Sequence, residues 1–75
     1  MDGVSNRFGH LIRAKRRLRG LSQEGLAELA DLNRSYLGKI ERGMAAPSIE
    51  TANKLARALG EALSELIAQC ETIDE

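Results

Sequence analysis

Four side chains that carry hydrogen-bond donors gather on a short predicted helix. Ser35, Lys39 and Arg42 fall at i, i+4 and i+7, so they share one face of a helix over about residues 34–42, and Arg34 lies beside them at its start. None of the four carries a carboxylate. Such a set suits phosphate oxygens and the guanine edges of a DNA major groove. On spacing alone, a merely solvated helix face explains the same residues about equally well.

A second short helix and a tight turn are needed to position this face. Ser22 is a suitable N-cap for a helix over about residues 23–30, and Asp31-Leu32-Asn33 is typical of a turn. Asn33 can cap the helix that follows it. Two short helices joined by three or four residues form a helix-turn-helix, and Ala27 is the small residue expected where they cross. The apolar residues expected to hold the pair together are Leu26, Ala30, Leu32, Leu37 and Ile40.

Helical spacing of apolar residues continues along the chain and predicts an all-α, compact domain of five helices. The predicted helices cover about residues 6–19, 23–30, 34–42, 49–59 and 63–70. Gly20, Gly43 and Gly60 are stop signals, Ser48 is a cap, and the acidic tail from Glu71 to Glu75 is expected to fray. The residues expected to face the core are Phe8, Leu11, Ile12 and Leu18; Leu26, Leu29 and Ala30; Leu37 and Ile40; and Ile49, Ala52, Leu55, Ala56 and Leu59. Leu63, Leu66, Ile67 and Cys70 form the apolar stripe of the last predicted helix.

Length and composition exclude several classes of protein. A chain of 75 residues predicts a single domain, 1–75, which regular helix packing or a partner subunit must stabilise. The single cysteine, Cys70, excludes an internal disulfide, and together with the single histidine, His10, it does not make a four-ligand zinc site. No apolar run approaches the roughly 20 residues of a membrane span, and no signal-peptide pattern is present. We therefore expect a cytoplasmic protein with no metal, cofactor, membrane association or small-molecule ligand.

No constellation in the sequence points to catalysis. Glu24 and Glu28 form a carboxylate pair at i, i+4, but no nucleophile, glycine-rich phosphate loop or metal cluster accompanies them. Cys70 is expected to act as a small apolar residue rather than a redox switch, and His10 as a surface or partly buried residue. We expect the protein not to be an enzyme.

Seven short motifs are spread along the chain, each weak alone but specific as a set. They are Leu21-Ser22-Gln23, Leu26-Ala27, Leu29-Ala30, Tyr36-Leu37, Ile40-Glu41-Arg42-Gly43, Pro47-Ser48 and Leu63-Ser64-Glu65-Leu66. With them, residues 7–67 resemble the phage repressor/Cro (XRE) type of helix-turn-helix regulator, which implies a lambda-repressor-like DNA-binding fold. The segment from Leu32 to Tyr36 is also similar to the controller proteins of restriction-modification systems, which are dimeric domains of similar size.

The resemblance implies roles for individual residues. It assigns base contacts to Arg34, Ser35 and Lys39, and Arg34 is the strongest specificity candidate because an arginine can form two hydrogen bonds with guanine. It also implies an ion pair between Arg16 and Glu41 that braces the recognition helix. The residues that would contact the DNA backbone are Gln23, Asn33, Tyr36 and Arg42.

The chain departs from the family pattern in four places. Asp31 stands at a turn position usually filled by glycine, although aspartate can adopt the left-handed conformation at modest cost. Gly25 and Gly38 lie inside helices, where each costs up to about 1 kcal/mol relative to alanine. The loop Met44-Ala45-Ala46 lacks the usual basic residues, and Glu61 replaces an apolar residue.

The expected partner is a double-stranded, palindromic DNA operator bound by a homodimer. One recognition helix would enter each of two successive major grooves, with half-site centres about 34–36 Å apart. The residues expected at the dimer interface are Leu63, Leu66, Ile67 and Cys70. The competing interpretation is an antitoxin or adaptor that uses the same fold to bind a protein.

The net charge of zero conceals two opposite halves. Residues 1–42 carry nine Lys or Arg and five Asp or Glu, whereas residues 43–75 carry two and six. The basic half contains the predicted recognition helix, so neutrality of the whole chain does not argue against a nucleic-acid partner.

Overall fold

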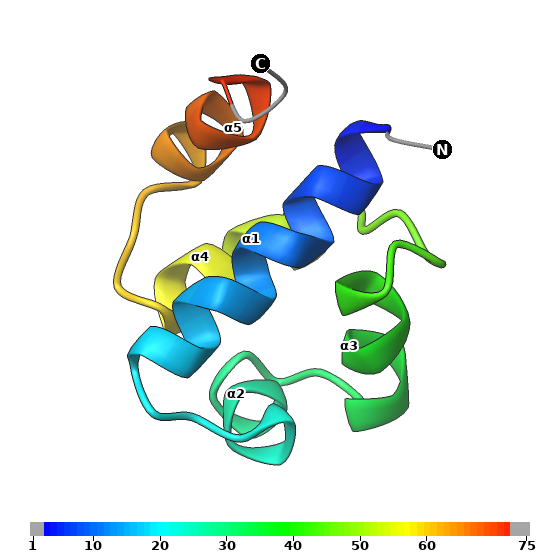
Figure 1. Ribbon diagram of the computed structural model, residues 1–75. Coiled ribbons are helices and arrows are strands. Elements are labelled where there is room, and N and C mark those ends of the chain that lie inside the picture. The colour runs from blue at the N-terminus through cyan, green and yellow to red at the C-terminus, as the bar shows by residue number, and fades with distance from the viewer. Residues whose placement is uncertain (1–2, 73–75) are drawn as a thin grey trace.

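The computed structural model describes residues 3–72, and these residues form five helices and no strand. The helices are α1 (Val4–Leu18), α2 (Gln23–Leu29), α3 (Arg34–Glu41), α4 (Ile49–Ala58) and α5 (Leu63–Thr72). α1 crosses the centre of the molecule, α2 lies at one end, and α5 and the start of α1 lie at the other (Figure 1). No helix in this range is long and apolar enough to cross a membrane.

Local hydrogen bonds set the starts of three helices. The Ser22 hydroxyl accepts from the backbone N–H of Gly25 at 2.9 Å, and the Asn33 side chain accepts from Tyr36 at 3.2 Å. The Ser48 hydroxyl accepts from Thr51 at 3.1 Å. These contacts satisfy backbone donors that the first turn of a helix leaves unpaired, so the starts of α2, α3 and α4 fall where the sequence predicts them.

The turn between α2 and α3 uses a left-handed residue. Asp31 has a φ of 58°, and the backbone N–H of Leu32 donates to the carbonyl of Ala27 at 2.8 Å. This 6→1 bond closes the end of α2 and directs the chain into α3. Aspartate therefore takes the conformation for which the family pattern uses glycine.

Gly9 is the point of closest approach between α1 and α3. A Cβ atom built there would overlap the carbonyl oxygen of Ile40 and lie 3.0 Å from that of Glu41. Because glycine has no side chain, the middle of α1 can lie directly against the last turn of α3. This contact fixes α3 against the central helix, α1.

The core contains most of the predicted apolar residues and excludes three. Leu18, Leu29 and Ile49 are 84%, 61% and 80% exposed, so their predicted burial is wrong. Each is the first or last residue of its helix, where the row of inward-facing positions has ended. The buried apolar residues are Phe8, Leu11, Ile12, Leu26, Ala27, Ala30, Leu37, Ile40, Ala52, Leu55, Ala56, Leu59, Leu66 and Cys70.

The apolar stripe of α5 belongs largely to this core. Leu66 and Cys70 have no exposed surface and Leu63 packs against the core at its edge, while Ile67 is 36% exposed. Placing Leu66 and Cys70 at a dimer interface is therefore wrong, because they are already covered by the chain itself. α5 also continues to Thr72, two residues beyond its predicted end, and the last part of the acidic tail, 73–75, lies outside the described residues.

Candidate nucleic-acid interface

A buried ion pair links α1 to the end of α3. Arg16 donates from Nε to Glu41 Oε2 at 2.8 Å and from Nη2 to Glu41 Oε1 at 3.0 Å, and it donates from Nη1 to the carbonyl of Leu21 at 2.9 Å. The two residues are 9% and 3% exposed. Two parallel bonds between a guanidinium and a carboxylate define both position and orientation, so the pair braces α3 against α1.

Gln23 joins this pair and is thereby positioned at the start of α2. Its side-chain amide donates from Nε2 to Glu41 Oε1 at 3.0 Å. Glu41 thus accepts three hydrogen bonds from two helices, and no buried side-chain polar atom among the described residues lacks a partner. The arrangement orders the one side chain of α2 that lies next to the exposed face of α3.

That face forms a shallow polar groove of about 320 Å³, which we call the α3 groove. It is lined by Gln23, Arg34, Ser35, Gly38, Lys39 and Arg42, and contains no carboxylate. Arg34, Ser35, Lys39 and Arg42 are exposed to solvent. The α3 groove therefore presents three cations and several hydrogen-bond donors on one surface, which suits a polyanion.

Gly38 leaves space above the helix for the ends of two of these side chains, Gln23 and Arg42. A Cβ atom at Gly38 would lie 3.3 Å from Arg42 Nη1 and 3.8 Å from Gln23 Oε1. Glycine at this position leaves room for the ends of both side chains above the α3 backbone. Glycine inside a helix lowers its stability, and at Gly38 it is used because a larger residue would crowd the Gln23 and Arg42 side chains.

Two other predicted backbone contacts lie outside the α3 groove. Asn33 is exposed, but its side-chain oxygen is occupied in capping α3. Tyr36 is half-buried and packs against the core. These residues flank the start of α3 rather than line its groove.

Arg13 lies beside this site, although it is not among the individual DNA contacts that the sequence analysis assigns. It lines a second polar depression, of about 220 Å³, beside Arg16, Gln23, Glu41 and Arg42. The signal in the sequence is its position three residues before Arg16 on the same helix face. Lys15, in contrast, pairs with Glu61 at 2.8 Å and does not line this depression. Glu61, which stands where the family pattern has an apolar residue, thus supplies a partly exposed ion pair.

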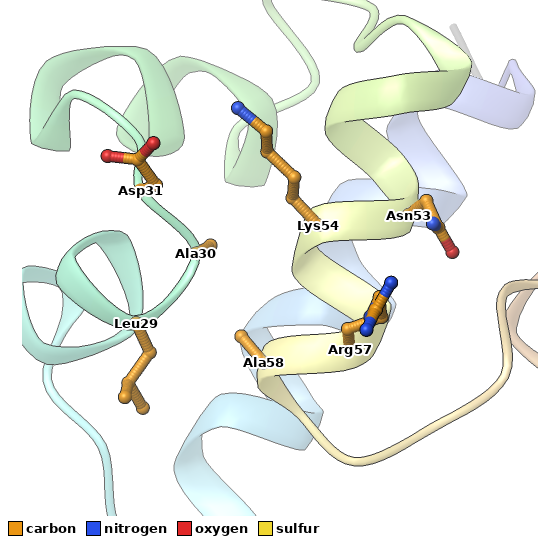
Figure 2. Close-up of a pocket in the computed structure, with 7 residues that line it drawn as sticks. All are labelled: Leu29, Ala30, Asp31, Asn53, Lys54, Arg57 and Ala58. Atoms are coloured by element: carbon orange, nitrogen blue, oxygen red, sulfur yellow. The ribbon is translucent and has the colours of Figure 1, made fainter.

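A mixed cleft of about 530 Å³ lies between the end of α2 and α4. Figure 2 shows Lys54 and Arg57 rising from α4, with Leu29 and Asp31 across from them on the α2 side.

The described residues contain no group of three His, Cys, Asp or Glu that could hold a metal ion. Cys70 is buried, and burial raises the pKa of its thiol, although Arg7 opposes the shift.

Comparison with known proteins decides the family. A model of the helix-turn-helix family HTH_3 matches residues 12–66, a segment that contains α2, α3 and α4 together with the second half of α1 and the start of α5. The chain belongs to this family. As an HTH_3 protein of the phage repressor/Cro type, it carries the DNA-binding domain of transcription regulators, and α2 and α3 are its helix-turn-helix pair.

Individual relatives of this HTH_3 chain include phage and restriction-modification proteins. The immunity repressor protein of Bacillus phage phi105 is 43% identical over 89% of the chain, and the chain spans 46% of that repressor's length. The control protein C.MunI of Mycoplasma sp is 36% identical over 95% of the chain and 97% of its own length. The structure resembles that of the restriction-modification controller protein C.AhdI from Aeromonas hydrophila, with a TM-score of 0.79 and 46% identity over 81% of this chain and 92% of that one.

Proposed function

We propose that the protein is a sequence-specific transcription regulator that binds a palindromic DNA operator as a homodimer, with α3 in the major groove. The observation that carries the proposal is the α3 groove, in which Arg34, Ser35 and Lys39 lie exposed beside Arg42 with no carboxylate among them. Base edges in the major groove offer acceptors to such donors, and phosphates accept from the cations around them.

Roles within the groove follow from position. Arg34, Ser35 and Lys39, on the first turns of α3, contact base edges. Arg42 and Gln23, at the margin of the groove, contact phosphates. Asn33 and Tyr36 contact the DNA backbone from the start of α3.

A controller protein of a restriction-modification system is the most specific form of this proposal. Support comes from C.MunI, whose whole length is nearly matched, and from the fold and 46% identity shared with C.AhdI. The proposed partner is then an operator that governs such a system, and the proposed compartment is the cytoplasm. Selection of bound duplexes from a random pool tests the proposal: a palindrome should be recovered, and recovery of no common sequence would refute sequence-specific binding.

Removing Arg34 should relax specificity, whereas removing Arg42 should weaken binding to all duplexes alike. The pair is matched in charge, since each change to alanine deletes one guanidinium. Loss of a bidentate contact to guanine costs about 1–3 kcal/mol of discrimination at one base pair. The measurement is titration of the selected duplex and of single-base variants with each protein. Equal loss of affinity for all duplexes in the Arg34→Ala protein would contradict a base-reading role.

Binding should weaken steeply as salt increases, because cations of the α3 groove displace counterions from phosphates. The logarithm of affinity falls linearly with the logarithm of salt, and each lost phosphate contact reduces the slope by about 1. Titration at several salt concentrations should give a shallower slope for Arg42→Ala than for the unaltered protein. Affinity that does not change with salt would exclude this mode of binding.

A further inference from the structure

The second polar depression, which we call the α1 depression, carries positive charge that its own residues do not neutralise. Three of its lining residues are arginines, Arg13, Arg16 and Arg42, and only Glu41 is acidic, so two positive charges remain in excess. The carboxylate of Glu41 is already occupied, because it accepts two hydrogen bonds from Arg16 and one from Gln23. Arg13 and Arg42 are exposed, and neither forms an ion pair with an acid in the described part of the chain.

Hydrogen-bond donors also converge where the α1 depression meets the α3 groove. The two hollows share Gln23 and Arg42. A Cβ atom at Gly38 would lie 3.3 Å from Arg42 Nη1 and 3.9 Å from Gln23 Nε2, so the ends of both side chains lie over the same point of α3. The Gln23 amide has two N–H groups, and its bond to Glu41 uses one of them. The other N–H can donate to a ligand.

We propose that Arg13, Gln23 and Arg42 together hold one phosphate group of a bound duplex, so that the DNA contact extends from α3 onto α1. The proposal rests on the DNA-binding function proposed above and adds Arg13 to the residues that serve it. A phosphodiester matches this site because it is an anion whose oxygens accept from guanidinium and amide N–H groups. An inorganic phosphate ion shares this chemistry, and the experiments below distinguish the two sources.

A phosphate held at Arg13 would orient α3 on the duplex. α1 is joined rigidly to α3, through the backbone contact at Gly9 and the buried pair of Arg16 with Glu41. A contact to the sugar-phosphate backbone carries no sequence information, but it fixes the register in which the other side chains meet the bases. Arg13 is therefore assigned a positioning role, distinct from that of the residues that read bases.

Titration of duplex DNA with Arg13→Ala and Arg57→Ala tests the proposal. Each change deletes one exposed guanidinium from a helix, but Arg57 lies in the cleft of Figure 2 and lines neither the α1 depression nor the α3 groove. Arg13→Ala should weaken binding to all duplexes alike. Its loss relative to Arg57→Ala should grow about 3-fold when salt is lowered about fourfold, because one phosphate contact contributes about 0.9 to the salt slope. Arg13→Lys should keep most of that slope, and circular dichroism confirms that each variant is helical.

Duplexes that carry a single uncharged methylphosphonate, placed at each phosphate in turn, locate the contact. At one phosphate in each half-site, the neutral group should weaken binding of the unaltered chain but should not weaken Arg13→Ala further. The two changes are non-additive there because each removes the same contact. At the remaining phosphates the effects of the two changes should add.

Two results would overturn the phosphate site. One is equal binding by Arg13→Ala and Arg57→Ala at every salt concentration. The other is a set of methylphosphonates that all weaken Arg13→Ala as much as they weaken the unaltered chain. If inorganic phosphate also raised the Tm of the unaltered chain but not that of Arg13→Ala, this second result would assign the site to a free ion.

These outcomes are independent of sequence specificity. A chain that binds all duplexes equally, yet loses one phosphate contact with Arg13, would refute the proposed regulator and leave the phosphate site standing. A selected palindrome that Arg13→Ala and Arg57→Ala bind equally well would remove the phosphate site and leave the proposed function standing.

Discussion

Replacing Gly9 with alanine is expected to lower the free energy of unfolding by about 3 kcal/mol, because the new methyl group overlaps backbone rather than a flexible side chain. The carbonyl oxygens of Ile40 and Glu41 cannot move away without shifting the end of α3 from α1. A native domain has only roughly 5–15 kcal/mol of stability, so this is a large share. Thermal unfolding followed by circular dichroism should show a Tm lower by about 15 °C.

Gly38→Ala is the matched control, since it makes the same change inside a helix. Its Cβ would meet the end of the Arg42 side chain at 3.3 Å, and that end can move. The gain in helix propensity should then leave stability unchanged or raise it by up to about 1 kcal/mol, while the displaced Arg42 should weaken DNA binding. If Gly9→Ala is no less stable than Gly38→Ala, the close approach of α1 and α3 is not what the structure indicates.

The second large effect is expected for Glu41→Gln, which removes the charge that Arg16 faces. The change keeps the side-chain volume but leaves a nearly buried guanidinium without its counter-ion. Breaking a buried pair from one side costs about 3–5 kcal/mol, and partial exposure of Arg16 places this case at about 3 kcal/mol. Urea unfolding of both proteins at neutral pH measures the difference.

Glu61→Gln is the control for Glu41→Gln, because it also deletes one carboxylate from an ion pair. Lys15 and Glu61 are 21% and 22% exposed at their side chains, more than Arg16 and Glu41 at 11% and 2%, so water screens this pair better and its loss should cost less. Equal destabilisation by the two substitutions would show that burial does not distinguish the pairs. The double variant Arg16→Met, Glu41→Leu should recover much of the loss, because it leaves no unpaired charge.

The starts of α2, α3 and α4 could be predicted from sequence because local chemistry sets them, whereas α1 begins two residues before its predicted start and α5 ends two residues after its predicted end. Ser22, Asn33 and Ser48 accept hydrogen bonds from residues three positions later, and such contacts depend on a few neighbouring residues only. The left-handed conformation of Asp31 likewise depends only on the turn in which the residue lies. The exposed donors of α3 could also be predicted, since their shared face follows from helical spacing alone.

Contacts between helices that are far apart in the sequence could not be predicted from spacing alone. The stripe of α5 has the same spacing whether it packs on its own chain or on a partner, and Leu66 and Cys70 turned out to be internal. Gly9 shows no sign in the sequence of the carbonyls that approach it. The hydrogen bond from Gln23 to Glu41 joins residues 18 positions apart and likewise needs the folded structure.

The separation of the exposed α3 donors from the buried frame has an evolutionary consequence. Arg34, Ser35 and Lys39 are at the surface, whereas Gly9, Arg16 and Glu41 are buried. Substitution at the three surface positions leaves the packing untouched, so under the proposed function descendants of this protein can acquire new operators without passing through unstable intermediates. A library randomised at these three positions is accordingly a practical route to retargeted regulators on an unchanged scaffold.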